Sequence, residues 1–566
     1  MHAQTIFFTF SDKALALSKK KCIFAALKQK QNLNHIIVMI KHWLLTFLAL
    51  TIPSACSFWP MAAKNSKITG TMEFQASGCD GQTPLWLNAN KYGLSCLSNA
   101  NAYARGMMYY DDEYKPWGVS YTVGSDLVLP LRYWHKGYND SEYRSTVILQ
   151  QLYAEVRWRK GAITIGAKQQ PAELRDNLLS SGAQTFGINA RPVPQGRLAM
   201  TDWWTIPFTK DWVAFKGHIA YGIMSDADWE EAFVYTSGNS YNRWTRFHEK
   251  AGYLRIGQEE KFPLTLTIGL EMGAQFGGSL FNYHGTDENG FRGSSGMKLK
   301  SDIRSYWNAF VPGGGDTNET EFQNAEGNQV GSWLARLNWE GENYAIGLYY
   351  DHFFEDHSSM FLLDYNGYGE GDQWREKQEL KFFAYNPEDG QWGLDLRLKN
   401  FSWIEAVTLE FMNTKYQSGP VYHDRNAGNS DHLGGIDDYY NHSTLPGWQH
   451  WGQAIGNPLY RSPQYNKDGY IRFEHNRFVA WHGGVRGTLA KDLNYRLLYT
   501  WQKSFGSYHK PVARPVENTS ILVEMTYQMP QHSFLRNFIV RAAYGMDKGD
   551  LFGNNKGLQI TVQYKM

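Results

Sequence analysis

The chain has 566 residues, with 56 basic and 55 acidic side chains, and its mean hydropathy is −0.50. The first 63 residues contain seven lysines and one acidic residue, so the rest of the chain has 49 basic and 54 acidic residues, a net charge of −5. This balance excludes nucleic acid as a partner, because phosphate binding requires a basic surface, and the even composition after about residue 66 predicts a single domain.

An export signal begins at Met39. A short basic start is followed by the apolar run 43–52 and then by small residues. A run of this length matches the apolar part of a signal peptide and is too short to cross a membrane as a helix. We therefore expect residues 39–63 to be a signal peptide and residues 64–566 to be the mature domain. Residues 1–38 are then an upstream extension from a misassigned start codon, with a cytoplasmic tail as the alternative.

Two cysteines of the expected mature chain, Cys79 and Cys96, flank a short polar stretch. In an oxidising compartment such a pair can close a disulfide across a turn, and two free thiols are the alternative. Neither cysteine has the His or Cys neighbours that a zinc site requires. We assign no cofactor and no metal ligand.

Apolar and polar residues alternate with a period of two from about residue 100 onward. The clearest examples are 152–159, 264–273, 344–350, 392–399 and 521–528. A parallel sheet covered by helices would be apolar on both faces. Alternation with charge on one face instead fits a membrane barrel with a wet lumen, or a soluble β-sandwich.

The last segment favours the barrel. Apolar residues at 558, 560, 562 and 564 alternate with polar ones, which resembles the terminal strand of outer-membrane proteins. Together with the export signal, this segment predicts an all-β protein, a single antiparallel transmembrane β-barrel of about 16–18 strands in a bacterial outer membrane. We expect the strand 558–565 to pair with a strand near the mature N-terminus and thereby close the barrel.

The connections are expected to carry the function. Stretches rich in Gly, Asn and Asp predict outer loops at 283–296, 312–331, 364–373 and 423–469. The segment 170–181 is one of few that are compatible with a helix.

Three stretches together resemble the Wzi family of capsule-assembly outer-membrane proteins. They are TPLWLNANKYG at 83–93, the stretch 179–195 that begins LSSG and ends NARPVPQ, and the stretch 437–459 that begins DDYYNH and ends IGNPL. The resemblance extends from roughly residue 68 to the end, and the aromatic loops and the cysteine pair are closer to members from Bacteroides-type bacteria. It implies an 18-stranded barrel with a small periplasmic helical element, which holds or assembles capsular polysaccharide as a lectin.

The stretch 437–451 is the candidate carbohydrate site. Aromatic rings suit the apolar faces of sugars, and planar polar groups suit their hydroxyls. The candidate residues are Asp437, Asp438, Tyr439, Tyr440, Asn441, His442, Trp448, His450 and Trp451. The alternative is that these rings fill the lumen or form a girdle at the membrane interface, where Trp and Tyr also gather; for Trp203 and Trp204 we favour that alternative.

Catalytic motifs are weak. The 17 histidines never form H-E-x-x-H, and the sequence GSSG at 293–296 lacks a nucleophile elbow. We predict a non-enzymatic, monomeric outer-membrane lectin with capsular or other surface polysaccharide and membrane lipid as partners. The alternatives are a diffusion porin for sugars or small solutes, and a barrel hydrolase.

We expect residues 1–63 to be absent from the protein isolated from membranes, because an apolar run of this length is read and removed by the secretion machinery. Mass spectrometry of the purified protein checks this. A peptide that contains Lys13 in the mature protein would contradict it.

Overall fold

The computed structural model divides the chain into two compact units, 1–66 and 67–566. It describes residues 68–112, 118–136, 142–282, 296–311, 327–355, 361–366, 376–382, 389–423, 433–442 and 444–566. The expected leader 1–63 and most of the expected outer loops at 283–296, 312–331 and 364–373 lie outside these residues. The expected loop 312–331 ends earlier than predicted, because Asn328 already belongs to a strand.

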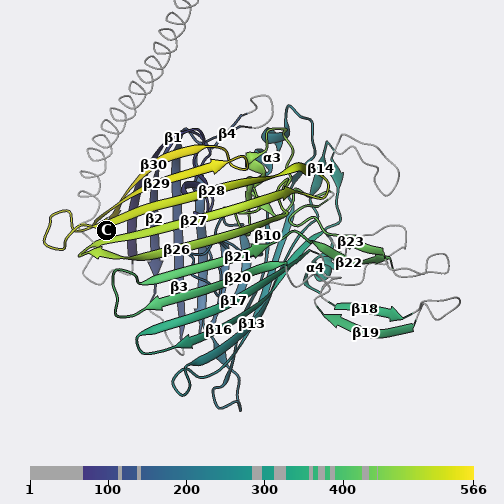
Figure 1. The fold of residues 1–566 in the computed structure, drawn as a ribbon, viewed down its shortest axis with the longest axis horizontal. Coiled ribbons are helices and arrows are strands. Elements are labelled where there is room, and N and C mark those ends of the chain that lie inside the picture. Colours follow the sequence, from purple (N-terminus) through teal and green to yellow (C-terminus); the bar gives the residue numbers. More distant parts are fainter. Residues whose placement is uncertain are drawn as a thin grey trace, which may run out of the picture. The chain divides into compact units, whose positions relative to one another are not determined.

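The second unit is a closed antiparallel β-barrel (Figure 1). Its strands are β1 (Ile68–Asp80), β2 (Ala100–Asp111), β3 (Val119–Leu131), β6 (Ile148–Trp158), β7 (Gly161–Ala167), β8 (Gln195–Met200), β9 (Trp204–Thr205), β10 (Val213–Ile223), β12 (Arg246–Ile256), β13 (Leu264–Phe276), β16 (Asn328–Glu340), β17 (Tyr344–Glu355), β20 (Gly390–Leu398), β21 (Ala406–Asn413), β26 (Phe478–Ala490), β27 (Leu493–Gly506), β28 (Pro511–Gln528), β29 (Phe538–Gly549) and β30 (Asn555–Lys565). β8 and β9 both pair with β10 and are two pieces of one interrupted strand. The barrel therefore has 18 strands within the described residues.

Closure occurs between the first and last strands, as expected. β30 pairs with β1 in antiparallel register, with Phe74 opposite Val562 and Ala76 opposite Ile560. Hydrocarbon offers no hydrogen-bond partner to an open sheet edge, so this pairing satisfies the backbone of both end strands. The prediction of a single antiparallel barrel is confirmed.

The two ends of the barrel differ. Turns such as 159–160, 341–343 and 491–492 are short at one end, which also carries the C-terminus, whereas the connections at the other end are long (Figure 1). Outer-membrane barrels have short periplasmic turns and longer extracellular loops. This rule assigns the long connections to the cell surface.

All short elements of the described residues lie in these long connections. They are the strands β4 (Trp134–Lys136), β5 (Glu142–Arg144), β11 (Tyr241–Arg243), β14 (Ser279–Phe281), β15 (Met297–Lys298), β18 (Phe361–Asn366), β19 (Glu376–Phe382), β22 (Ser418–His423), β23 (Leu433–Ile436), β24 (Gln449–His450) and β25 (Gln453–Ala454), and the helices α2 (Leu85–Asn88), α3 (Ala227–Val234), α4 (Ile303–Phe310) and η4 (Pro463–Tyr465). The family resemblance implies a small helical element on the periplasmic side. The short helices of the described residues lie at the opposite end of the barrel. No helix of the described ranges is long and apolar enough to span a membrane.

The segment 170–181 forms turns rather than the helix that its composition allows. The Asn177 side chain accepts a hydrogen bond from the Ala172 amide (3.0 Å) and donates one to the Ala172 carbonyl (2.9 Å). Asp176 accepts one from the Leu178 amide (2.8 Å). Such local side-chain bonds compete with helical backbone bonds.

The barrel wall is apolar outside and polar inside. On β30, Leu558 and Ile560 are exposed while Gln559 and Thr561 are buried, and β3 and β6 show the same alternation. A soluble sandwich would bury its apolar face instead. The apolar outer face and the even strand number define a bacterial outer-membrane β-barrel.

A charge placed on the lipid face tests this assignment. Ile560 lies in the middle of β30 with half of its surface exposed (50%). Ile560→Arg should destabilise the barrel by about 2–4 kcal/mol, the cost of Arg near the bilayer midplane. The matched control is Phe534→Arg in a short turn, where the side chain is 93% exposed and where we expect about 0–1 kcal/mol. Folding into vesicles at graded urea, followed by heat-modifiable gel mobility, measures both, and equal losses would contradict a lipid-facing Ile560.

Candidate functional site

Three of the long connections fold into the barrel rather than outward. We call them together the plug; they are residues 81–99, 168–194 and 437–477. These connections contain the three stretches that resemble the Wzi family. Trp86, Leu179 and Trp448, one from each segment, are buried in one common core.

Hydrogen bonds join the three plug segments to one another. The Asn90 amide group donates to the Ser181 carbonyl (2.9 Å), and the Trp448 indole donates to the Thr185 carbonyl (2.8 Å). Gly182 permits this approach, because its φ of +131° is strained for other residues and a Cβ there would lie 3.2 Å from Cδ of Pro458. The Gly and Pro residues of the three stretches therefore serve the inward fold.

The plug is tied to the wall on all sides. Its partners come from strands spread around the barrel: Gln150 of β6 bonds the Tyr92 carbonyl, Phe247 of β12 stacks on Trp448, Ser332 of β16 bonds Thr185, Thr500 of β27 bonds Trp86, and Asp547 of β29 bonds the Leu85 amide. A barrel of 18 strands otherwise encloses a wide lumen. Here protein crosses that lumen.

One tie between the plug and the wall is ionic. Arg175 of the plug pairs with Asp351 of β17 at 2.7 Å, and the two side chains are 2% and 0% exposed. Nearby, the Ser180 hydroxyl and the Ser181 amide donate to the Glu410 carboxylate at 2.6 and 2.8 Å. Buried carboxylates on the wall thus hold the middle plug segment through charge and hydrogen bonds together.

Most of the predicted sugar-binding residues lie inside the plug. Six are buried: Asp437, Tyr439, Tyr440, Asn441, Trp448 and His450. The aromatic rings among them pack against other protein rings: Tyr440 lies 4.0 Å from Tyr460 in a tilted arrangement, and Trp448 stacks 5.5 Å from Phe247, both between ring centroids. In this arrangement the six fill the lumen, which is the alternative that the sequence left open. Asp438, His442 and Trp451 are only half-buried.

A buried polar centre surrounds His450. Its Nδ1 donates to the Arg191 carbonyl (2.8 Å), and the Ser225 amide donates to its Nε2 (3.2 Å). Both bonds fit a neutral imidazole, and burial lowers the pKa of His450. Burial also lowers the pKa of Arg191 to about 10, and the Arg191 guanidinium stacks 4.4 Å from the Trp451 ring. These groups are structural members of the plug.

The neighbouring helix α3 and its N-cap residue, Asp226, contribute two acids to the same centre. The Gln449 side chain donates to Asp226 (3.1 Å) and Glu230 (3.0 Å). Burial, and then the Asp226 charge, raises the pKa of Glu230 well above its usual range. The protonated form of Glu230 is therefore favoured where it lies beside Asp226 in this buried centre.

The outer side of the plug carries a different set of groups, which we call the outer patch: Asp438, Tyr470, Arg472, Tyr508, His509 and Lys510. Asp438 lies 3.8 Å from both Arg472 and His509. The Arg472 guanidinium lies 5.7 Å from the Tyr470 ring, and the Arg477 guanidinium lies 3.8 Å from the Tyr508 ring. Only Asp438 was predicted, because the patch joins the plug to the β27–β28 turn, which is remote in sequence.

The predicted disulfide is absent from the structure. Cys79 and Cys96 are both free. The Cys79 thiol lies 3.9 Å from the Thr83 hydroxyl, and the Cys96 thiol lies 3.2 Å from the Trp134 carbonyl. Each thiol therefore has its own polar neighbour. This is the alternative of two free thiols.

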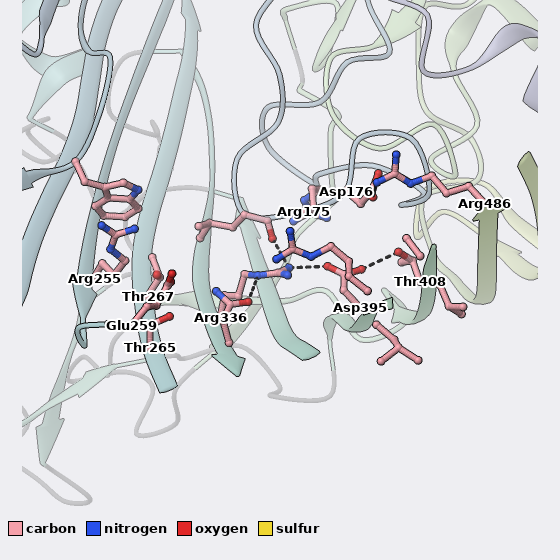
Figure 2. A pocket seen from close by; sticks show the side chains of 17 residues that line it. Arg175, Asp176, Arg255, Glu259, Thr265, Thr267, Arg336, Asp395, Thr408 and Arg486 are labelled. Atoms are coloured by element: carbon pink, nitrogen blue, oxygen red, sulfur yellow. Dashed lines mark hydrogen bonds and ion pairs between the residues drawn. The ribbon is translucent and has the colours of Figure 1, made fainter. Parts of the chain in front are cut away.

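A cavity of about 370 Å³ lies below the plug on the short-turn side (Figure 2). We call it the inner chamber. Its lining includes five arginines and three acids: Arg175, Arg255, Arg336, Arg397, Arg486, Asp176, Glu259 and Asp395. Ion pairs hold four of the five arginines: Arg175 with Asp351, Arg336 with Asp395, Arg397 with Glu340 and Arg486 with Asp176.

Figure 2 shows how these groups are held. Arg336 pairs with Asp395 (2.7 Å) and donates to the Leu174 carbonyl of the plug (2.8 Å). Arg255 instead lies over the Trp203 ring at 4.6 Å. Trp203 is thus part of the chamber lining, whereas Trp204 is exposed on the outer face. The Arg255 guanidinium and the Trp203 ring both line the chamber, and such a pair suits an acidic ligand that enters from the short-turn side.

Comparisons with known proteins give the fold alone. No family model matches the chain, and no curated protein matches it. Among solved structures it is similar to Wzi of Escherichia coli, described as a carbohydrate-binding β-barrel involved in group 1 capsule assembly, with 10% identity over 87% of this chain and 83% of that one and a TM-score of 0.48. It is also similar to OprD of Pseudomonas aeruginosa (9% identity, 88% and 94% covered, TM-score 0.40) and to OccAB2 of Acinetobacter baumannii (10% identity, 88% and 98% covered, TM-score 0.43). These values do not separate the barrels by function.

The plug tie can be cut by one substitution. Asp351→Ala leaves Arg175 buried without its counter-ion, which costs about 3–5 kcal/mol and should release the middle plug segment. We expect ion-conducting openings in planar bilayers that the unmodified barrel lacks. The control is Asp202→Ala, which removes an exposed ion pair with Lys160 (3.2 Å) and should change nothing measurable. An Asp351→Ala barrel that stays closed would show that the plug does not depend on this ion pair.

Proposed function

We propose that this outer-membrane barrel is a monomeric, non-enzymatic lectin of the Wzi family that holds an acidic capsular or other surface polysaccharide at the cell surface. The observation that carries the proposal is the plug. A diffusion porin needs an open lumen, whereas protein bonded to five strands around the wall crosses this one.

The sequence resemblance supports the same reading. The stretches 83–93, 179–195 and 437–459 lie far apart in the chain and form one body in the barrel. The stretches that resemble the Wzi family are thus the ones that build the plug.

The chemistry of the outer patch supports an acidic glycan. Tyr470 and Tyr508 offer rings for sugar faces, and the Arg472 guanidinium offers positive charge for carboxylates, whereas Lys510 is paired with Asp468 and Glu474. Asp438 can accept hydroxyl hydrogen bonds. The site that we propose is therefore the outer patch, above the buried rings of 437–451.

The binding test uses the double variant Tyr470→Ala/Arg472→Ala. Loss of one ring and one guanidinium, at roughly 1 kcal/mol each, should weaken binding of the bacterium's own capsular polysaccharide by more than tenfold, and repeated contacts along a polymer enlarge that loss. The measurement is polysaccharide bound per folded barrel, with folded barrels counted by heat-modifiable mobility. Tyr235→Ala is the matched control, because Tyr235 is exposed at the same end but lies outside the outer patch.

The alternatives predict other outcomes. Trp448→Ala should lower the amount of folded barrel while leaving binding per barrel unchanged, because Trp448 is part of the plug core. Steady conductance by the unmodified protein, with equal binding by all variants, would favour the porin and overturn the lectin.

A further inference from the structure

We propose that α4 is a membrane-surface helix whose exposed apolar side inserts among anionic lipids of the outer leaflet. The proposal concerns the outside of the barrel and does not depend on the polysaccharide site.

The first step is that α4 lies against the outer face of the wall. On β10 and β12, His218 and Glu249 line a cavity inside the barrel. Residues alternate between faces along a strand, so Tyr221 and His248, which oppose each other in the ladder, point outward. Their rings stack at 4.3 Å.

Tyr306 of α4 packs on this outer face. Its ring lies 5.4 Å from Tyr221 and 5.1 Å from Phe276 at the end of β13. The Tyr221 hydroxyl also donates to the Tyr306 carbonyl (2.8 Å). Ala309 is buried in the same cluster.

Both ends of the helix are held. At the N-terminus the Asp302 side chain accepts a hydrogen bond from the Ser305 amide (2.9 Å), an N-cap. At the C-terminus the outward-facing Lys250 of β12 donates to the carbonyls of Ala309 (2.8 Å) and Phe310 (2.5 Å). A cation at this end also matches the helix dipole. The rotation of α4 about its axis is thereby set.

The face turned away from the wall is apolar. Ile303 and Trp307 lie one turn apart on this face and are 89% and 61% exposed. Phe310, 37% exposed, lies at the edge of this face, where its ring also contacts His248 and Lys250 of the wall. Ser305 and Ala309 on the opposite face are buried. A large aromatic and two other apolar side chains on one short helix are unfavourable in water.

The level of α4 matches the edge of the membrane. A transmembrane strand crosses the hydrocarbon in about 9–11 residues. Because β13 has 13 residues, Leu264–Phe276, Phe276 lies at the far edge of the hydrocarbon if the strand enters it near Leu264. α4 packs at Phe276, at the end of the barrel with the long connections (Figure 1). The exposed cations Lys298, Lys300 and Arg304 lie on or just before the helix. An amphipathic helix with basic residues and an aromatic anchor, at this depth, binds an anionic lipid surface.

Site-directed spin labelling tests the proposal. Single cysteines replace Ile303 or Trp307 in a Cys79→Ser/Cys96→Ser background, and the full barrels are placed in vesicles of phosphatidylcholine and phosphatidylglycerol. Heat-modifiable mobility confirms folding for each variant. Leu348→Cys on the lipid belt and Tyr235→Cys on the exposed surface are the reference positions.

We expect labels at 303 and 307 to collide with oxygen, as at Leu348, and to be shielded from a water-soluble nickel complex. Access by the nickel complex equal to that at Tyr235 would overturn the proposal, and so would shielding from both reagents, because the face would then be covered by protein. In phosphatidylcholine alone the labels should lie closer to water. Equal depth in the two lipid mixtures would remove the preference for anionic lipid.

Discussion

The absence of hydrogen-bond partners in hydrocarbon is the constraint on which the rest of this structure depends. It forces the sheet to close between β1 and β30, and it places the apolar side chains on the outside. The polar side chains then face inward, around a lumen that 18 strands make too wide for side chains alone to fill. The interior of the barrel is accordingly completed by three main-chain segments.

Those segments bring their own polar groups into the barrel, so the plug is stable only while each group has a partner. The wall supplies acids such as Asp351 and Glu410 where the plug presents Arg175, Ser180 and Ser181. Such a network specifies one arrangement, because displacing any member leaves a buried charge or donor unsatisfied. It follows that the plug is part of the folded barrel, in contrast to a loop lying loosely in a pore.

The plug also divides the molecule into two chemical faces. Above it, the outer patch combines tyrosines with Arg472, His509 and Asp438; below it, the inner chamber combines Trp203 with five arginines. Both faces pair rings with guanidinium groups, but the outer patch lies at the end with the long connections and the inner chamber lies toward the short turns. The long connections serve both this patch and the outside wall, where α4 covers the outward-facing Tyr221 and His248.

The sequence by itself determined the fold class, because alternation along a strand is a local property: Leu558 and Gln559 report the two faces of the wall wherever the strand lies. It also identified the three stretches that build the plug, whose Gly and Pro residues encode local turns such as the one at Gly182. Only the tertiary structure decided which aromatic residues are available to a ligand. Tyr440 and Tyr470 belong to the same connection and have the same chemistry, yet one is buried against Gln184 and Tyr460 and the other is exposed. Their difference comes from which part of the loop meets the wall and the other two plug segments, and those partners lie hundreds of residues away in the chain.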